Sequence, residues 1–142
     1  KYIDSAKPRM GKVRYENGYR IKGHKTEIKV ANQLREQFGG KIVLLKEANT
    51  QGTKTPDYLW RGKLWELKSV STAKAADMAI RSGVKQIKGK PGGVVLQCAD
   101  GVNIDDMVRI VDARALRNTM FDFDVIAMRE NGEFLFARRY KK

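Results

Sequence analysis

Residues 55–69 read TPDYLWRGKLWELKS and predict a β-hairpin. Two runs of β-favouring residues, 57–60 and 63–69, flank Arg61-Gly62, which is suited to a tight turn. A two-residue or four-residue turn centred there pairs positions whose numbers sum to 123, so that Asp57 lies directly opposite Glu66. Because residues two apart on a strand share a face, Lys68 projects from the same side. A three-residue or bulged turn would instead put the two carboxylates on opposite faces.

Two opposed carboxylates in this register predict a cation site. Their Cβ atoms lie about 4.5–5.5 Å apart, and like charges at that distance destabilise the hairpin unless one is protonated or a cation lies between them. Carboxylate oxygens are typical ligands of Mg²⁺, with Mn²⁺ or Zn²⁺ as alternatives. We expect Asp57 and Glu66 to hold the metal, and Lys68 to orient a water or stabilise phosphate charge in the transition state. The alternative is a solvated hairpin face with salt bridges from lysines.

A third acid lies on the helix predicted for residues 26–38. Its apolar stripe is Val30, Ala31, Leu34 and Phe38, Thr26 is placed to cap it, and Gly39-Gly40 ends it. Glu27 falls on the same stripe, so a helix packed on the hairpin would let Glu27 join the metal site. An acid in the first turn also stabilises the helix dipole with no other role.

The other periodic segments predict a mixed sheet with flanking helices. They comprise strands over residues 41–46 and 94–98, helices over 72–88 and 104–116, and a second hairpin of 124–128 with 133–138 around Asn131-Gly132. Asn103 is placed to cap the helix over 104–116, whose predicted inward side chains are Met107, Ile110, Val111 and Leu116. This order predicts an α/β (α+β) single domain over residues 23–142, after a basic, weakly structured lead-in over 1–22.

Composition narrows the classes of protein to which the chain can belong. It has 142 residues, of which 42% are apolar, and this content fits a folded domain. Its net charge of +13 favours attraction to an anionic partner. Nucleic acid is the first candidate, with an acidic membrane surface or an acidic protein as alternatives. One Cys and one His exclude a disulfide framework and a Cys/His zinc cluster within the chain. No apolar run is long enough for a membrane span and no leader opens the sequence, so we expect no membrane insertion by this domain. The first residue, Lys1 rather than Met, suggests a piece of a longer protein or a processed product.

The motif Thr55-Pro56-Asp57 followed by Glu66-Leu67-Lys68 resembles that of the PD-(D/E)xK nuclease superfamily, and Glu27 matches the helical acid frequent in that superfamily. More narrowly, the segments HKTE (24–27), KTPDYL (54–59) and WELKS (65–69) resemble the C-terminal nuclease domains of contact-dependent growth inhibition and related polymorphic toxins. The resemblance covers about residues 20–100.

The resemblance implies a restriction-endonuclease-like fold and RNA cleavage, commonly of tRNA. It also implies metal held by Asp57 and Glu66, catalysis by Lys68, and a site completed by Glu27. A cognate acidic immunity protein is the implied partner. The domain would be secreted or delivered from the cell surface as the end of a larger protein, and would act in the cytoplasm of the target cell. A DNA endonuclease of the same superfamily is one alternative function, and a non-catalytic basic nucleic-acid-binding module is the other.

Further residues have expected roles near this motif. His24, the only imidazole, is a candidate general acid or base or phosphate contact, and otherwise a loop residue. The candidate substrate-binding residues are Ser69, Arg81, Lys85, Gln86 and Lys88. Without any substrate, Ser69 is equally well explained as a strand hydroxyl. The other candidates, on the predicted helix, are equally well explained as part of a solvated basic face. The aromatic residues Tyr58, Trp60 and Trp65 are expected in the core, and Cys98 is expected to be an inert buried thiol.

Overall fold

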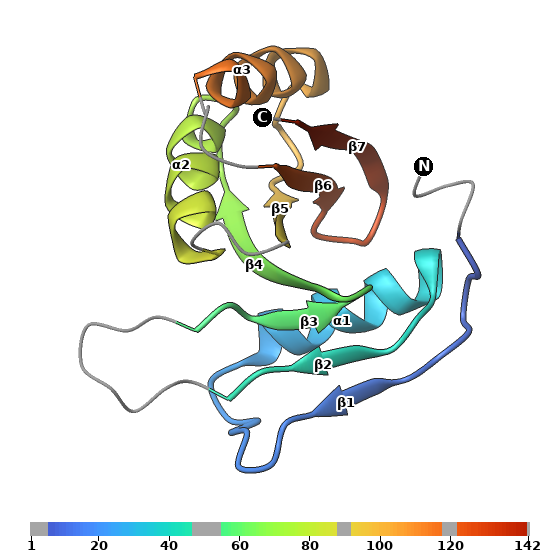
Figure 1. Cartoon of the computed structure of the whole chain (residues 1–142). Coiled ribbons are helices and arrows are strands. Elements are labelled where there is room, and N and C mark those ends of the chain that lie inside the picture. Colours follow the sequence, from blue (N-terminus) through green and yellow to red (C-terminus); the bar gives the residue numbers. More distant parts are fainter. Residues whose placement is uncertain (1–5, 47–54, 88–91, 118–121, 142) are drawn as a thin grey trace. The chain divides into compact units, whose positions relative to one another are not determined.

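The computed structural model describes residues 6–46, 55–87, 92–117 and 122–141 (Figure 1). It divides the chain into two compact units, Lys1–Trp65 and Glu66–Lys142, and the boundary falls within one strand. The described residues form three helices and seven strands with parallel and antiparallel pairings. This is the mixed-sheet α+β class that the sequence predicts.

The first unit is a small sheet with one helix. Its elements are β1 (Val13–Tyr15), α1 (Lys25–Phe38), β2 (Ile42–Leu44), β3 (Tyr58–Trp60) and the start of β4 (Lys63–Val70). Strand β1 runs parallel to β2, and β2 and β3 each pair antiparallel with the next strand. Strand β1 lies within the lead-in that the sequence predicts as weakly structured.

The hairpin of β3 and β4 has the predicted register. Its pairs are Tyr58 with Trp65, Leu59 with Leu64 and Trp60 with Lys63, and each pair sums to 123. Both turn residues have positive φ, 54° at Arg61 and 70° at Gly62, which is the geometry of a type I′ turn. Such a turn has the twist of the strands that it joins, so the short sequence Arg61-Gly62 sets the pairing of the whole hairpin.

Helix α1 covers the face of this sheet that carries the aromatic residues. The rings of Phe38 and Trp60 lie 6.0 Å apart, and the indole Nε1 of Trp60 donates a hydrogen bond of 3.0 Å to the carbonyl of Gly39. Tyr58, Trp60 and Trp65 are each at most 1% exposed, which confirms their prediction as core. The helix begins one residue earlier than predicted, at Lys25, with His24 rather than Thr26 in the N-cap position.

The second unit contains two helices and the other strands. After β4 come α2 (Ala75–Ile87), β5 (Gly92–Cys98), α3 (Ile104–Leu116), β6 (Phe123–Arg129) and β7 (Phe134–Tyr140). Strand β4 neighbours β5, β5 and β6 are parallel, and β6 and β7 form the predicted second hairpin. Asn103 caps α3 as predicted, since its side chain accepts a hydrogen bond of 3.0 Å from the Asp106 amide.

Two predicted inward side chains of α3 are placed differently. Leu116 is 84% exposed and Ile110 is only half-buried, whereas Met107 and Val111 are fully buried. The end of a helix can carry apolar residues beyond the sheet that it covers, so periodicity overestimates burial there. None of the described helices is both long and apolar enough to span a bilayer.

Candidate functional site

The acid of the predicted motif that lies on β4, Glu66, is a buried charge. It is 5% exposed, and its Oε2 atom lies 3.4 Å from the Nζ atom of Lys68, two residues along the same strand. The other carboxylate oxygen, Oε1, is buried without a hydrogen-bond partner among the described residues. A buried carboxylate oxygen without a partner raises the free energy of the folded state, because water solvates that oxygen in the unfolded chain.

Strand alternation shows which face carries this pair. The hydroxyl of Ser69 donates a hydrogen bond of 3.1 Å to the Gln97 side-chain oxygen on β5, so these two residues share one face of the second unit's sheet. Glu66 and Lys68 therefore lie on the other face, together with Val94 of β5. Helix α2 packs on this face, because a Cβ atom added at Gly83 would lie only 2.6 Å from Val94 Cγ2.

Asp57 belongs to the first unit and lies in a bend directly before β3. Its backbone carbonyl accepts a hydrogen bond of 3.0 Å from the Leu45 amide, so the residue continues the ladder between β2 and β3. Its side chain is half-buried.

Glu27 and His24 lie at the start of α1. The Tyr58 hydroxyl donates a hydrogen bond of 2.6 Å to the Glu27 carbonyl, which fixes the first turn of α1 on the Tyr58 face of β3. The side chain of Glu27 is half-buried, and its meeting with Asp57 stays a prediction. The Nδ1 atom of His24 lies 2.6 Å from the Arg20 carbonyl, to which it donates, and the ring packs 5.2 Å from that of Tyr19.

A complete set of metal ligands is not assembled within the described ranges. No group of three or more His, Cys, Asp or Glu side chains there is placed to hold a metal ion. The three-acid set of Glu27, Asp57 and Glu66 thus stays a prediction. The chemistry of Glu66 does fit a hard cation, because its Oε1 atom is an anionic oxygen ligand that has no hydrogen-bond partner in the part of the chain that the structure describes.

The candidate substrate-binding residues lie on β4 and α2 of the second unit. Ser69, Arg81 and Lys85 are exposed, and the half-buried Gln86 has a buried side-chain oxygen without a hydrogen-bond partner in the described structure. Arg81 and Lys85 are one turn apart, so they extend one basic strip along α2. Lys88 lies outside the described residues.

Cys98 has the environment expected of an inert thiol. It is fully buried, its sulfur lies 3.4 Å from that of Met107, and burial raises its pKa to about 11. The reactive form of cysteine is the thiolate, which such a pKa suppresses at neutral pH.

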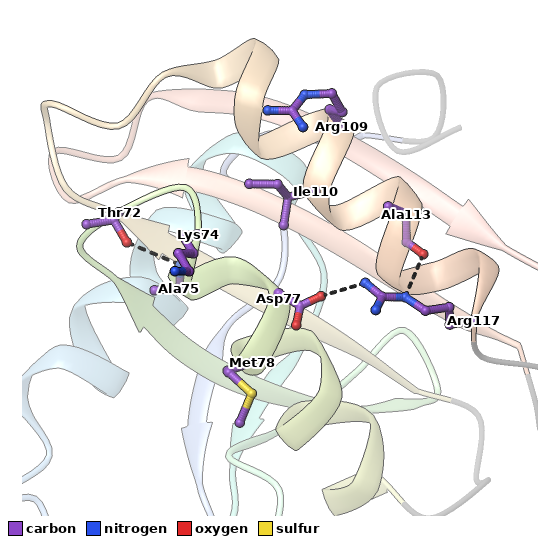
Figure 2. Close-up of a pocket in the computed structure, with 9 residues that line it drawn as sticks. All are labelled: Thr72, Lys74, Ala75, Asp77, Met78, Arg109, Ile110, Ala113 and Arg117. Carbon is purple, nitrogen blue, oxygen red and sulfur yellow. Dashed lines mark hydrogen bonds and ion pairs between the residues drawn. The ribbon is translucent and has the colours of Figure 1, made fainter.

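A charged cluster that the sequence does not predict lies between α2 and α3. Asp77 accepts hydrogen bonds of 2.8 and 2.6 Å from Arg114. It also accepts one of 3.0 Å from Arg117, which Figure 2 shows. The hydrogen bonds from Arg114, more than any other contact, hold the pKa of Asp77 below its ordinary value of 3.8. Asp77 and Arg114 are far apart in sequence, so no local pattern indicates their pairing.

Comparisons with known proteins give one structural likeness. No protein-family model matches the chain, and no curated protein matches it. Among solved structures, a chain of the CdiA-CT/CdiI toxin and immunity complex from Burkholderia pseudomallei is similar to it, with a TM-score of 0.47 and 14% identity. The likeness covers 92% of this chain and 100% of that chain.

Proposed function

We propose that the protein is a metal-dependent toxin endonuclease that hydrolyses phosphodiester bonds, with tRNA of a target bacterial cell as the favoured substrate. The observation that supports this most directly is the buried pair on β4, in which Glu66 has one oxygen beside Lys68 and one without a hydrogen-bond partner within the described segments. A buried acid and a lysine two residues apart are the ExK half of the nuclease motif that the sequence resembles.

Glu66 is the first metal ligand in this proposal, through its Oε1 atom. Asp57 is the candidate second ligand, on the sequence motif and its resemblance alone. When bound, a divalent ion such as Mg²⁺ would lower the pKa of a water and offset charge on the phosphate. Glu27 stays a candidate third ligand on the resemblance alone.

Lys68 has two roles that its position supports. Its ammonium lies beside Glu66, so it offsets part of the buried negative charge. In a substrate complex the same ammonium would orient the attacking water or donate to a phosphate oxygen as negative charge develops there. His24, at the first turn of α1, is a candidate proton donor to the leaving oxygen, a role that the toxin-like sequence around it favours.

The net charge of +13 supports a nucleic-acid substrate. Arg81 and Lys85 on α2 would contact phosphates, while Ser69 and Gln86 offer neutral hydrogen-bonding groups. Such contacts to the backbone carry little sequence information, so tRNA rather than DNA is proposed from the toxin resemblance alone. The same resemblance supports an acidic immunity protein as the partner.

A cleavage assay on the full chain tests this function. The protein is incubated with tRNA, total RNA and plasmid DNA, in Mg²⁺ or in EDTA, beside Glu66→Gln and Lys68→Ala. Glu36→Gln and Lys29→Ala are matched controls, because both positions are exposed on α1. We expect discrete tRNA fragments that EDTA abolishes, with at least a 100-fold loss in both site variants and none in the controls.

Other outcomes would revise the proposal in defined ways. Cleavage of plasmid alone, lost in the same variants, would keep the site and move the substrate to DNA. Absence of cleavage by folded protein that still binds RNA would contradict the enzyme and favour a non-catalytic binding module. Circular dichroism of each variant separates loss of activity from loss of folding.

A further inference from the structure

The second unit has an unassigned groove between α2 and α3, with a volume of about 550 Å³ (Figure 2). Lys74, just before α2, and Met78 on α2 line one side of it. Arg109, Ile110 and Ala113 of α3, with Arg117 at its C-cap, line the other. Neither Glu66 nor Lys68 is among its lining residues. The groove is therefore a feature separate from the pair proposed for catalysis.

The lining of the groove is mostly apolar. Met78 is 59% exposed, although an unbranched thioether side chain is normally buried, and Ile110 is only half-buried. Leu116, 84% exposed, lies one turn after Ala113 and extends the apolar surface of α3. Methionine adapts its shape to different apolar partners, which makes it common at surfaces that bind them.

The edges of the groove are positively charged. Lys74 is exposed on one side, and the side chains of Arg109 and Arg117 on the other are 71% and 60% exposed. The one carboxylate among the lining residues, Asp77, already accepts hydrogen bonds from Arg114 and Arg117. The ion pair of Arg109 with Asp106 is long, at 3.4 Å, and exposed on both sides, so it constrains Arg109 weakly.

We propose that this groove binds an acidic amphipathic segment of a partner protein. Apolar side chains of the segment would pack on Met78, Ile110 and Ala113, and its carboxylates would face Lys74, Arg109 and Arg117. A helix that lays one apolar face in a groove is a common mode of peptide recognition. The groove and its charges are independent of the nuclease proposal.

The lining favours a protein segment over a nucleic acid. None of the residues that line the groove is aromatic. Proteins that bind single-stranded RNA or DNA commonly combine a positively charged groove with aromatic rings on which bases stack, and this groove has the charge without the rings. A partner with aliphatic and acidic side chains matches both the apolar lining and the charges at its edges.

A designed peptide tests the groove on the full chain. The probe is a fluorescein-labelled helix of about 16 residues, with Leu on one face and Glu on the other. One control peptide has the same composition in scrambled order, and another has Lys in place of Glu. We expect the acidic amphipathic peptide to bind at least ten times more tightly than either control, and to shift amide NMR signals of α2 and α3.

Two variants then assign the binding to the groove. Met78→Glu and Arg109→Glu change exposed side chains, so both should fold, and each should weaken binding of the acidic peptide at least tenfold. Met10→Glu and Lys29→Glu make the same changes at exposed positions in the first unit, and should leave the affinity unchanged.

Four results would overturn the assignment. Equal binding of the scrambled peptide would do so, because general charge attraction would then suffice. Absence of peptide binding would also do so, as would equal weakening by the control variants. In the fourth, Met78→Glu abolishes binding of a labelled single-stranded oligouridylate but leaves peptide binding intact, because the groove would then hold nucleic acid.

Discussion

Glu66 combines two properties that rarely occur together without a ligand, near-complete burial and an anionic oxygen without a hydrogen-bond partner among the described residues. Lys68 compensates only one of its two carboxylate oxygens. Burial of a polar atom without a partner costs about 1–3 kcal/mol, so a residue kept in this state is a candidate for binding or catalysis. The proposed metal would satisfy this oxygen.

At the same scale, Asp77 makes a testable contribution to stability. We expect Asp77→Asn to lower the free energy of unfolding at neutral pH, because it removes the charge that holds Arg114 and Arg117. The folded-state pKa of Asp77 lies below 3.8, so its contribution is present above that value and is lost as the pH falls through the folded-state pKa. Urea unfolding at pH 7 and below pH 3 measures the contribution of Asp77 to the free energy of unfolding.

The free energies of unfolding of the wild type and of Asp77→Asn should differ clearly at pH 7 and become equal at the lower pH. Asp105→Asn is a matched control, since Asp105 is exposed in the first turn of α3. An equal difference at both pH values would contradict a contribution from the Asp77 charge.

Individual site residues were predictable only where the local pattern fixes their positions. The hairpin register follows from the Arg61-Gly62 turn, and strand alternation then gives Glu66 and Lys68 a shared face. The burial of Glu66 was not predictable, because it depends on elements distant in sequence. The Asp77–Arg114 pair spans 37 residues, and a side-chain pair at that separation leaves no periodic signal.

At the scale of elements, the β3–β4 turn depends on backbone conformation. Gly62 has a φ of 70°, and a Cβ atom added there would contact nothing within 4 Å. Any loss of stability in Gly62→Ala therefore comes from left-handed backbone strain, which costs about 1–2 kcal/mol. Thermal unfolding measures this loss against wild type.

The matched control for this substitution is Gly101→Ala. Gly101 has equally open surroundings, but its φ lies outside the left-handed region. We expect Gly101→Ala to leave stability within about 0.5 kcal/mol of wild type. Equal effects of the two substitutions would contradict the turn assignment.

Helix α2 offers a second test at this scale, because Gly83 lies within the helix. Alanine favours a helix over glycine by about 1 kcal/mol, which alone would stabilise the protein. The new Cβ atom would instead lie 2.6 Å from Val94 Cγ2, and overpacking of this kind costs about 1–3 kcal/mol. We expect Gly83→Ala to destabilise the fold in chemical denaturation.

The packing explanation predicts coupling with Val94. In a Val94→Ala background the added Cβ atom has room, so the cost of Gly83→Ala should disappear or become a gain. Additive effects of the two substitutions in a double-mutant cycle would reject contact as the cause.

Most elements were predictable because their patterns are local. All three helices have clear periodic apolar stripes, and both hairpins have recognisable turns. Strand β1 was missed since its sequence, Val-Arg-Tyr, has no buried residue and its pairing with β2 is parallel and distant in sequence. The N-cap of α1 was misplaced at Thr26 because His24, which makes no side-chain capping bond, occupies that position.

At the scale of the whole molecule, the net charge of +13 predicts the character of RNA binding. Binding through phosphate contacts releases counterions, so the association constant should fall about 100-fold between 50 and 200 mM salt for a handful of contacts. Each of Arg81→Ala and Lys85→Ala should reduce the slope of log K against log salt by about 0.7, and Lys29→Ala should not. Fluorescence anisotropy with labelled tRNA measures this, and a salt-independent affinity would contradict it.

The central claim is that Glu66 holds a divalent cation, and paramagnetic NMR tests it most directly. Mn²⁺ is added in small steps to the ¹⁵N-labelled protein, since a bound Mn²⁺ ion broadens nearby amide signals. We predict broadening first at residues 66–68, reversed by EDTA and absent in Glu66→Gln, with Glu36→Gln behaving as wild type. Broadening that persists unchanged in folded Glu66→Gln, or that never reaches residues 66–68, would contradict the claim.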